Sequence, residues 1–332
     1  MTRREMMAAM AAALPLAAAP RSKMGIATTS YMTVWRPRDT YEFLEHCHSI
    51  GAGGIQSSLT SMEPAYISKV RSRAEQLGMY IELMGPLPRA GTEQFEAVLR
   101  ASKEVGAICV RSACLGGRRY ETFNSLADWK KFVADSHAAI ERALPLLEKH
   151  KVKMALENHK DWTTEEFLKL LAKFKSEYLG VCLDTGNNVA LLDDPLEMTE
   201  ALAPYTFSTH IKDMGVALYK DGFLLSEVPL GEGFLDLKKI VAVVQKAQPQ
   251  VKMSLEMITR NPLQVPCLTE KYWLTFEGRE GKHLARTLAM VREKEKSQPL
   301  PSIDGLDKEA QQRWEADNVK QCLNYARQHL GL

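Results

Sequence analysis

The chain alternates short apolar runs with amphipathic stretches, and this alternation constrains the fold more than any other feature. Eight runs are typical of buried strands; they are residues 24–31, 53–59, 79–85, 107–115, 152–159, 178–186, 206–213 and 251–259. Apolar residues at helical spacing lie between them, at residues 38–50, 94–105, 126–147, 164–174, 196–202 and 237–247. Strands that alternate with helices indicate a parallel sheet. Eight such units predict a closed (β/α)8 barrel, a TIM barrel of the α/β class.

Residues at the expected helix boundaries agree with this prediction. Gly51, Gly78 and Gly106 stand where a helix would end in a left-handed residue. Thr163 and the pair Asp194-Pro195 are typical of helix starts. An open doubly wound sheet is the alternative fold. It is disfavoured because no GxGxxG turn follows the first apolar run.

The length and composition are those of one barrel with an added tail. A chain of 332 residues with 45% hydrophobic content can bury a large core. We expect the barrel at residues 23–296 and a C-terminal helical extension at residues 297–332, packed on the barrel or on a second subunit of a homodimer. The net charge of +2 argues against nucleic acid as a partner, because phosphate binding needs a concentrated basic face. A small polar substrate is the expected partner.

The N-terminus, residues 1–22, is typical of an export signal. Arg3 and Arg4 precede an uncharged stretch at residues 6–19, which ends in small residues suited to cleavage. Adjacent arginines favour the twin-arginine route to the bacterial periplasm. A cytoplasmic protein with a frayed N-terminal helix is the alternative. The stretch is too short to span a bilayer, so no membrane association is expected after processing.

Four polar residues stand at the ends of four successive apolar runs: Glu157, Asp184, His210 and Glu256. The first two separations are 27 and 26 residues, or one strand–helix unit each, and the third, of 46 residues, contains an insertion. Because the carboxyl ends of barrel strands meet at one mouth, we expect these side chains to converge. Carboxylates and an imidazole are ligands of hard or borderline divalent cations. They predict one divalent metal ion, Mn²⁺ or Mg²⁺ first, with Co²⁺ and Zn²⁺ as alternatives.

The insertion between the seventh apolar run and its helix covers residues 214–235. Residues 219–223 are typical of a hairpin with Asp221-Gly222 at the turn. In a barrel this segment would lie at the mouth, where active sites are built.

The motifs around these residues resemble the xylose-isomerase-like superfamily of TIM barrels, the sugar isomerase and epimerase group. The resemblance covers most of residues 24–295 and rests on ALENH, LDTGN, HIKD and SLE, which contain the four residues, and on PLGEGFLD at residues 229–236. It implies that Glu157, Asp184, His210 and Glu256 hold one divalent metal, often manganese. It also implies that Glu157 and Glu256 move protons on either face of a sugar.

Other polar residues of the apolar runs are candidates for catalysis or substrate binding. Lys212 follows His210 by two residues and could stabilise an enediolate, bind a carboxylate or pair with Asp213. The candidates for substrate binding are His159, Arg111, Glu82 and Gln56. Polar groups inside strands are costly unless they are paired or functional.

The function predicted from these residues is a metal-dependent sugar isomerase or epimerase, which removes a proton next to a carbonyl and returns it elsewhere. A lyase on the same scaffold (a dehydratase or an enzyme that cleaves keto-glycosides) and a non-catalytic sugar-binding protein remain alternatives. Asn187 stands where the DNA-repair endonucleases and ketohexose 3-epimerases of the superfamily carry histidine, and Val216 where those epimerases carry arginine. These departures argue against a nuclease and against epimerisation of free ketohexoses.

The export signal predicts a processed N-terminus. Mass spectrometry of the secreted protein should show a chain that starts near residues 19–21. An intact Met1 on protein from the bacterial cytoplasm would contradict export.

Overall fold

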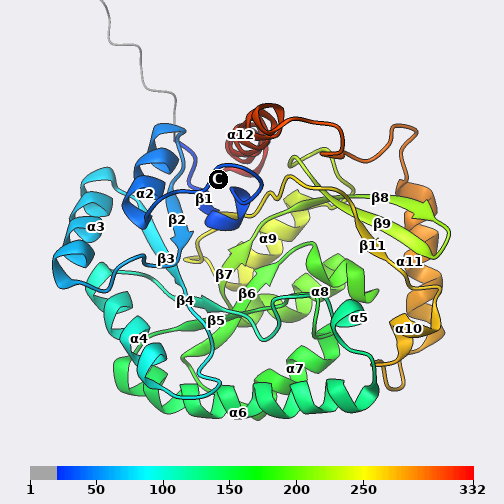
Figure 1. Ribbon diagram of the computed structural model, residues 1–332, viewed down its shortest axis with the longest axis horizontal. Coiled ribbons are helices and arrows are strands. Elements are labelled where there is room, and N and C mark those ends of the chain that lie inside the picture. Colours follow the sequence, from blue (N-terminus) through cyan, green and yellow to red (C-terminus); the bar gives the residue numbers. More distant parts are fainter. Residues whose placement is uncertain (1–20) are drawn as a thin grey trace, which may run out of the picture.

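Eight parallel strands form the predicted barrel (Figure 1). In order around the sheet they are β10 (Ser254–Leu255), β1 (Gly25–Ala27), β2 (Gly54–Ser57), β3 (Tyr80–Met84), β4 (Val110–Ser112), β5 (Met154–Glu157), β6 (Leu179–Asp184) and β7 (Thr206–His210). The barrel closes between β7 and β10, where Ile211 bridges to Leu255 and its backbone N–H donates to the carbonyl of Ser254 at 2.8 Å. The TIM barrel prediction is therefore confirmed.

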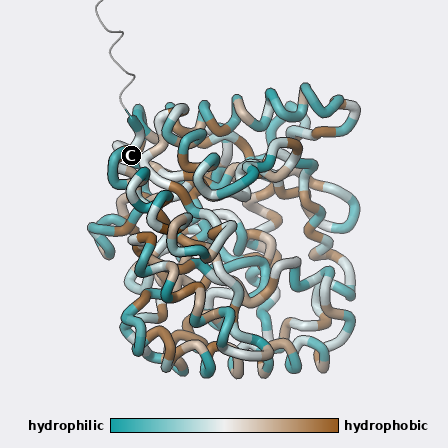
Figure 2. Tube along the Cα trace, turned by 60° about the vertical axis from the view of Figure 1, so that its left-hand side comes forward, coloured by the Kyte–Doolittle hydropathy of each residue, from teal (hydrophilic) through white to brown (hydrophobic). Residues whose placement is uncertain are grey.

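Helices surround the barrel, and the computed structural model describes them over residues 21–332. They are α2 (Thr40–Ser49), α3 (Pro64–Leu77), α4 (Glu93–Val105), α5 (Arg119–Thr122), α6 (Leu126–His150), α7 (Thr164–Lys173), α8 (Pro195–Leu202), α9 (Leu237–Ala247), α10 (Glu270–Trp273), α11 (Gly281–Lys294) and α12 (Lys308–Tyr325). Hydrophobic and hydrophilic segments alternate along the outer helical turns in Figure 2, as expected for helices with one buried face. None of the described helices combines the length and apolarity that a membrane-spanning segment needs. The predicted export signal falls almost wholly on residues 1–20, which lie outside the described residues.

The helix boundaries follow the predicted local chemistry. Gly51, Gly78 and Gly106 have φ of 86°, 63° and 75°, the left-handed region that favours glycine after a helix. Thr163 starts α7 with a reciprocal capping box, in which its side chain accepts from the backbone N–H of Glu166 and Glu166 accepts from that of Thr163.

The structure also departs from the predicted elements. The first run, residues 24–31, gives only three strand residues and then a 3-10 turn at Thr28–Ser30, and the last run gives only two. The apolar pattern did not indicate α3 and α11. The reason is that α3 buries only three of its 14 residues and α11 only two, so the helical period is weak.

The insertion after β7 forms a small antiparallel sheet of β8 (Asp213–Tyr219), β9 (Gly222–Val228) and β11 (Leu263–Val265). The predicted hairpin is confirmed, but its turn is Lys220-Asp221, and Gly222 is already the first residue of β9. Gly222 has φ of 151°, and a Cβ there would lie 2.2 Å from the carbonyl oxygen of Val265. Glycine is therefore required by close backbone approach.

The C-terminal extension packs on the barrel of its own chain through α12 (Figure 1). Glu315 Oε1 accepts from the backbone N–H of Thr33 at 2.8 Å, and Asn318 donates to Thr259 Oγ1 at 2.9 Å. Thr33 and Thr259 follow β1 and β10, so α12 lies beside the barrel mouth.

A buried arginine at the start of α5, Arg119, joins this helix to its neighbours. The Arg119 side chain is fully buried and binds both carboxylate oxygens of Glu166, at 2.6 and 3.2 Å. Its guanidinium lies 3.6 Å from the Trp129 ring centroid and 4.1 Å from that of Phe276. A single side chain thus links α5, α6, α7 and the segment after α10.

Replacing Arg119 tests this linkage. Arg119→Ala should lower the free energy of unfolding by about 3–5 kcal/mol, because it leaves Glu166 without its partner and opens a cavity. Urea denaturation measures the change. Lys131→Ala, which removes an exposed pair with Asp135 on α6, is the control and should change stability little. Equal effects of the two substitutions would contradict the role of Arg119.

Candidate metal centre

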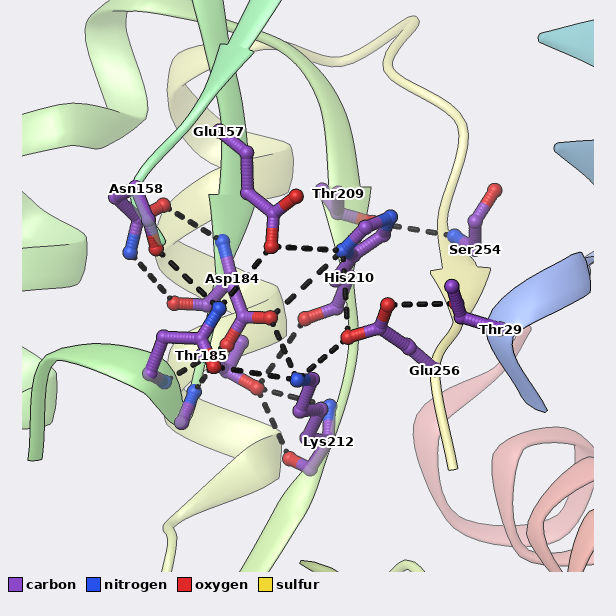
Figure 3. A network of polar contacts seen from close by, with 12 residues as sticks. Thr29, Glu157, Asn158, Asp184, Thr185, Thr209, His210, Lys212, Ser254 and Glu256 are labelled. Atoms are coloured by element: carbon purple, nitrogen blue, oxygen red, sulfur yellow. Dashed lines mark hydrogen bonds and ion pairs between the residues drawn. The ribbon is translucent and has the colours of Figure 1, made fainter. Parts of the chain in front are cut away.

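The four predicted strand-end residues meet in one buried cluster (Figure 3). Glu157, Asp184 and His210 are the last residues of β5, β6 and β7, and Glu256 follows β10 directly. Each offers a ligand atom, and these atoms lie within 4.8 Å of one another. The parallel register explains the convergence, since Asp184 and His210 are direct neighbours across β6 and β7.

The donor atoms face one another around His210 Nδ1. This nitrogen lies 3.4 Å from Glu157 Oε1, 3.7 Å from Asp184 Oδ2 and 3.5 Å from Glu256 Oε2. It is buried and makes no hydrogen bond. A buried polar atom without a partner, beside three carboxylates, fits a cation-binding site. The cluster could therefore hold a divalent metal.

The second ring nitrogen of His210, Nε2, is held by a hydrogen bond to Gln56. Nε2 lies 2.7 Å from Gln56 Oε1, and Gln56 Nε2 donates to Glu82 Oε2 at 2.9 Å and to Ser208 Oγ at 3.2 Å. Because the Gln56 amide presents its oxygen to the ring, Nε2 is the donor of this hydrogen bond, and Nδ1 is the nitrogen that faces the carboxylates and could bind a metal. Partners of this kind set the tautomer of metal-binding histidines.

This placement changes the interpretation of Gln56 and Glu82, which the sequence suggested as substrate ligands. Both side chains are fully buried, and their hydrogen bonds go to His210, Ser208 and Ser254. Burial raises the pKa of Glu82, while the hydrogen bonds from Gln56 and the two serines oppose that rise. Their geometry supports positioning of the His210 ring and does not support substrate contact.

Asp184 is held by the backbone on one side. Its Oδ1 accepts from the N–H groups of Gly186 and Asn187 at 2.9 and 2.8 Å, while Oδ2 faces the cluster. Asn158 braces the same strand end, donating to the Asp184 carbonyl and accepting from its N–H. Asn187 also donates to Glu157 Oε1 at 3.1 Å. Asn187 thus contacts two of the four cluster residues.

Lys212 lies inside the cluster (Figure 3). Its Nζ is 2.5 Å from Glu256 Oε2, 3.0 Å from Asp184 Oδ2 and 3.8 Å from Glu227 Oε1. Burial alone would lower the pKa of Lys212, but the carboxylates of Asp184, Glu256 and Glu227 raise it above its ordinary value. The ammonium is therefore charged at neutral pH.

The alternative pairing of Lys212 with Asp213 is not formed. Asp213 accepts instead from the backbone N–H groups of Gly231, Gly233 and Leu235, at 2.9 to 3.2 Å. A Cβ at Gly233 would lie 2.0 Å from Asp213 Oδ1. The backbone N–H groups of the glycines in PLGEGFLD therefore bind the Asp213 carboxylate.

Arg111 and His159 border the cluster. Arg111 pairs with Glu157 Oε2, and its side chain remains 16% exposed. His159 is half-buried. Its pKa lies well below the ordinary value, mainly because of burial and also because the positive charges of Lys160 and Arg111 are close. His159 Nδ1 makes no hydrogen bond. Both lie where substrate could reach them, and substrate binding by them stays a prediction.

Three charged residues near the cluster were missed by the sequence analysis. Lys160 is buried and donates to Asn187 Oδ1, and its burial together with the charges of Lys212 and Arg260 lowers its pKa to about 7. Glu227, on β9, is buried between Lys212 and Arg260, and Arg260 Nη2 lies 2.5 Å from its Oε1. Lys160 directly follows the ALENH motif, but no pattern indicated that the insertion carries Glu227 back to the mouth.

Comparison with known proteins places the chain in a family. The model of the xylose isomerase-like TIM barrel family matches residues 44–288. This chain belongs to that family. It is 27% identical over 246 residues to a 3-oxo-isoapionate decarboxylase from Pectobacterium atrosepticum. The aligned region covers 70% of this chain and 85% of that relative.

Several solved structures share the fold at low identity. A 3-keto-D-glucoside 4-epimerase from E. coli has a TM-score of 0.56 at 12% identity and covers 82% of this chain and 100% of its own. The IOLI protein, solved with a zinc atom, has a TM-score of 0.54 at 17% identity, with 83% and 99% coverage. A probable 3-DHS dehydratase from Bacillus anthracis has a TM-score of 0.52 at 18% identity, with 77% and 99% coverage. Proteins that share this fold thus include an epimerase and a probable dehydratase, and the relative found by sequence is named as a decarboxylase.

The role of Gln56 is testable by metal affinity. Gln56→Leu should weaken binding of Mn²⁺ or Zn²⁺ about 10–100-fold, because the His210 ring loses the acceptor that sets its tautomer. Competition with a chelator measures the affinity. Gln76→Leu, on the exposed surface of α3, is the control. Unchanged affinity in Gln56→Leu would contradict the positioning role.

Proposed function

We propose that this protein is a divalent-metal-dependent enzyme that removes a proton from the carbon next to a carbonyl of a small sugar, as an isomerase or epimerase. The observation that carries the proposal is the convergence of Glu157, Asp184, His210 and Glu256 on one buried point, with Lys212 among them. Membership of the xylose isomerase-like family supports it.

The proposed metal ligands are these four residues. Three carboxylates and one imidazole suit Mn²⁺ best, with Mg²⁺, Co²⁺ and Zn²⁺ as further candidates. When bound, the ion supplies a Lewis acid that stabilises negative charge on a carbonyl oxygen.

Glu157 and Glu256 are the proposed acid and base. They come from β5 and β10, which flank β6 and β7 in the closed barrel, so they stand at the two ends of the arc of donors. A sugar across this arc would have one carboxylate near each face. One takes a proton and the other returns one, to the same carbon for epimerisation or to the adjacent carbon for isomerisation.

Lys212 is the proposed electrostatic partner of this proton transfer. Its charged ammonium is fixed by Asp184 and Glu256 before any substrate arrives, and a preorganised buried charge stabilises developing negative charge better than water does. Arg111 and His159, at the border of the cluster, are the proposed contacts for substrate hydroxyl groups.

A lyase is the second candidate, and the cations around the cluster favour it. Arg111, Lys160, Lys212 and Arg260 surround the carboxylates, which suits a substrate with a carboxylate of its own. The curated relative is a decarboxylase of an oxo acid by its name. In decarboxylation the bond to the carboxylate breaks, CO₂ leaves, and the electron pair stays on the carbon next to the carbonyl until a proton is added there. Loss of a β-substituent after proton removal, in a dehydratase or a keto-glycoside lyase, would use the same residues.

One assay separates these functions. The metal-loaded protein is incubated in deuterated water with free ketoses, 3-keto-glycosides and 3-keto sugar acids. Solvent deuterium in a recovered isomer supports the isomerase or epimerase, whereas released CO₂, water or aglycone supports the lyase. Tight binding without exchange or release would identify a non-catalytic sugar-binding protein and overturn the proposal. Export to the periplasm and pairing into a homodimer remain separate proposals from the sequence.

Glu256 is the sharpest single test of the mechanism. Glu256→Gln should reduce turnover about 10²–10⁴-fold and weaken metal retention, because it removes both a proton carrier and a charged ligand. Rate measurement together with metal analysis of the variant checks both effects. Glu104→Gln, an exposed change on α4, is the control. Full activity in Glu256→Gln would remove Glu256 from the mechanism.

A further inference from the structure

A cavity of about 140 Å³ lies between the barrel mouth and the C-terminal extension. Its lining comes from β9 and the loop after it, the chain after β10, the loop before α12, and α12 itself. Residues that represent these segments are Glu227, Met257, Arg260, Pro301, Trp314 and Asn318.

This cavity borders the candidate metal centre. Met257 directly follows Glu256, and Glu227 Oε1 lies 3.8 Å from Lys212 Nζ on one side and 2.5 Å from Arg260 Nη2 on the other. Glu227 therefore lines the cavity and also contacts the cluster through Lys212. A substrate that reaches the cluster would extend into the cavity if it carried a further group.

The walls of the cavity are fixed by hydrogen bonds. Asn318 donates to Thr259 at 2.9 Å, which holds α12 against the chain after β10. The loop before α12 is held by Asn261, whose Oδ1 accepts from Ser302 Oγ at 2.9 Å and from the N–H of Ile303 at 2.8 Å. The cavity is therefore preformed, as expected of a binding site.

The size and chemistry of the cavity indicate its occupant. A cavity of about 150 Å³ holds a benzene molecule, so the volume here suits one ring and not two. Trp314, Met257 and Pro301 offer apolar surface, while Arg260, Glu227 and Asn318 offer charged and amide groups. A sugar ring has an apolar face and an edge of hydroxyl groups, and so matches both kinds of surface.

We propose that this cavity is a second subsite, which binds a further sugar ring attached to the sugar that lies at the metal centre, with Trp314 as the stacking surface. The proposal rests on the proposed function, since it places the reacting sugar at the cluster, and it narrows the substrate class to glycosides of at least two rings. The C-terminal extension then selects the substrate.

Binding measurements test the subsite without any need for turnover. Cellobiose, maltose and trehalose, and the methyl α- and β-glucosides as one-ring counterparts, are titrated calorimetrically into the metal-loaded full-length protein. At least one disaccharide should bind about tenfold more tightly than its methyl glucoside, which corresponds to about 1.4 kcal/mol. Trp314→Ala should remove this difference and leave the affinity for the methyl glucoside within about twofold.

Two further variants keep the test decisive. Trp314→Phe retains an aromatic surface and should retain part of the preference, which also covers the case in which the alanine variant does not fold. Arg313→Ala, one residue earlier on α12 with its side chain 62% exposed, is the matched control and should behave as the wild type.

The possible outcomes separate the subsite from the proposed reaction. The subsite is contradicted if no disaccharide binds more tightly than its methyl glucoside, including the case in which none of the sugars binds. It is also contradicted if Trp314→Ala weakens both classes of ligand equally. A preference that depends on Trp314, without deuterium exchange or product release from any keto sugar, would support the subsite and overturn the proposed reaction.

Discussion

The mutual repulsion of three buried carboxylates is the constraint on which the rest of this structure depends. Glu157, Asp184 and Glu256 approach one imidazole nitrogen within 3.4 to 3.7 Å, in a place that water hardly reaches. Like charges at this distance are unfavourable unless cations compensate them. Lys212 and Arg111 each supply one positive charge, and a divalent ion would add to this compensation. The chain maintains this costly arrangement at the mouth of a fold whose eight parallel strands bring distant residues together.

The surroundings of the cluster determine what it can bind. Gln56 and Glu82 lie beneath His210 and orient its Nδ1 toward the carboxylates, while Gly186 and Asn187 hold one oxygen of Asp184. These contacts fix the donors before any ion arrives. A preformed donor set lowers the cost of ordering on binding, which is how supporting residues increase the affinity of a metal site.

Much of the fold and the core of the site could be predicted from sequence because they depend on local periodicity and on one geometric rule. Strand runs that end in Glu157, Asp184 and His210 are recognisable one at a time, and barrel closure places their ends together. The position of Gln56 beneath His210 could not be predicted, because the sequence showed a polar residue in a strand but not whether it faced the substrate or lay below another ligand. Glu227 and Trp314 reach the mouth through an inserted hairpin and a terminal helix, whose packing no periodicity encodes. Helix α3 was missed for a related reason, since only Ile67, Val70 and Ala74 mark its buried face.

The central claim is that the four strand-end residues together bind one cation. Metal-stripped protein can be titrated with Mn²⁺ while free Mn²⁺ is followed by electron paramagnetic resonance, in the wild type and in Asp184→Ala. The account predicts one tightly bound ion per chain in the wild type and loss of tight binding in the variant. A wild-type protein that binds no ion, or a variant that binds it equally well, would contradict the shared site.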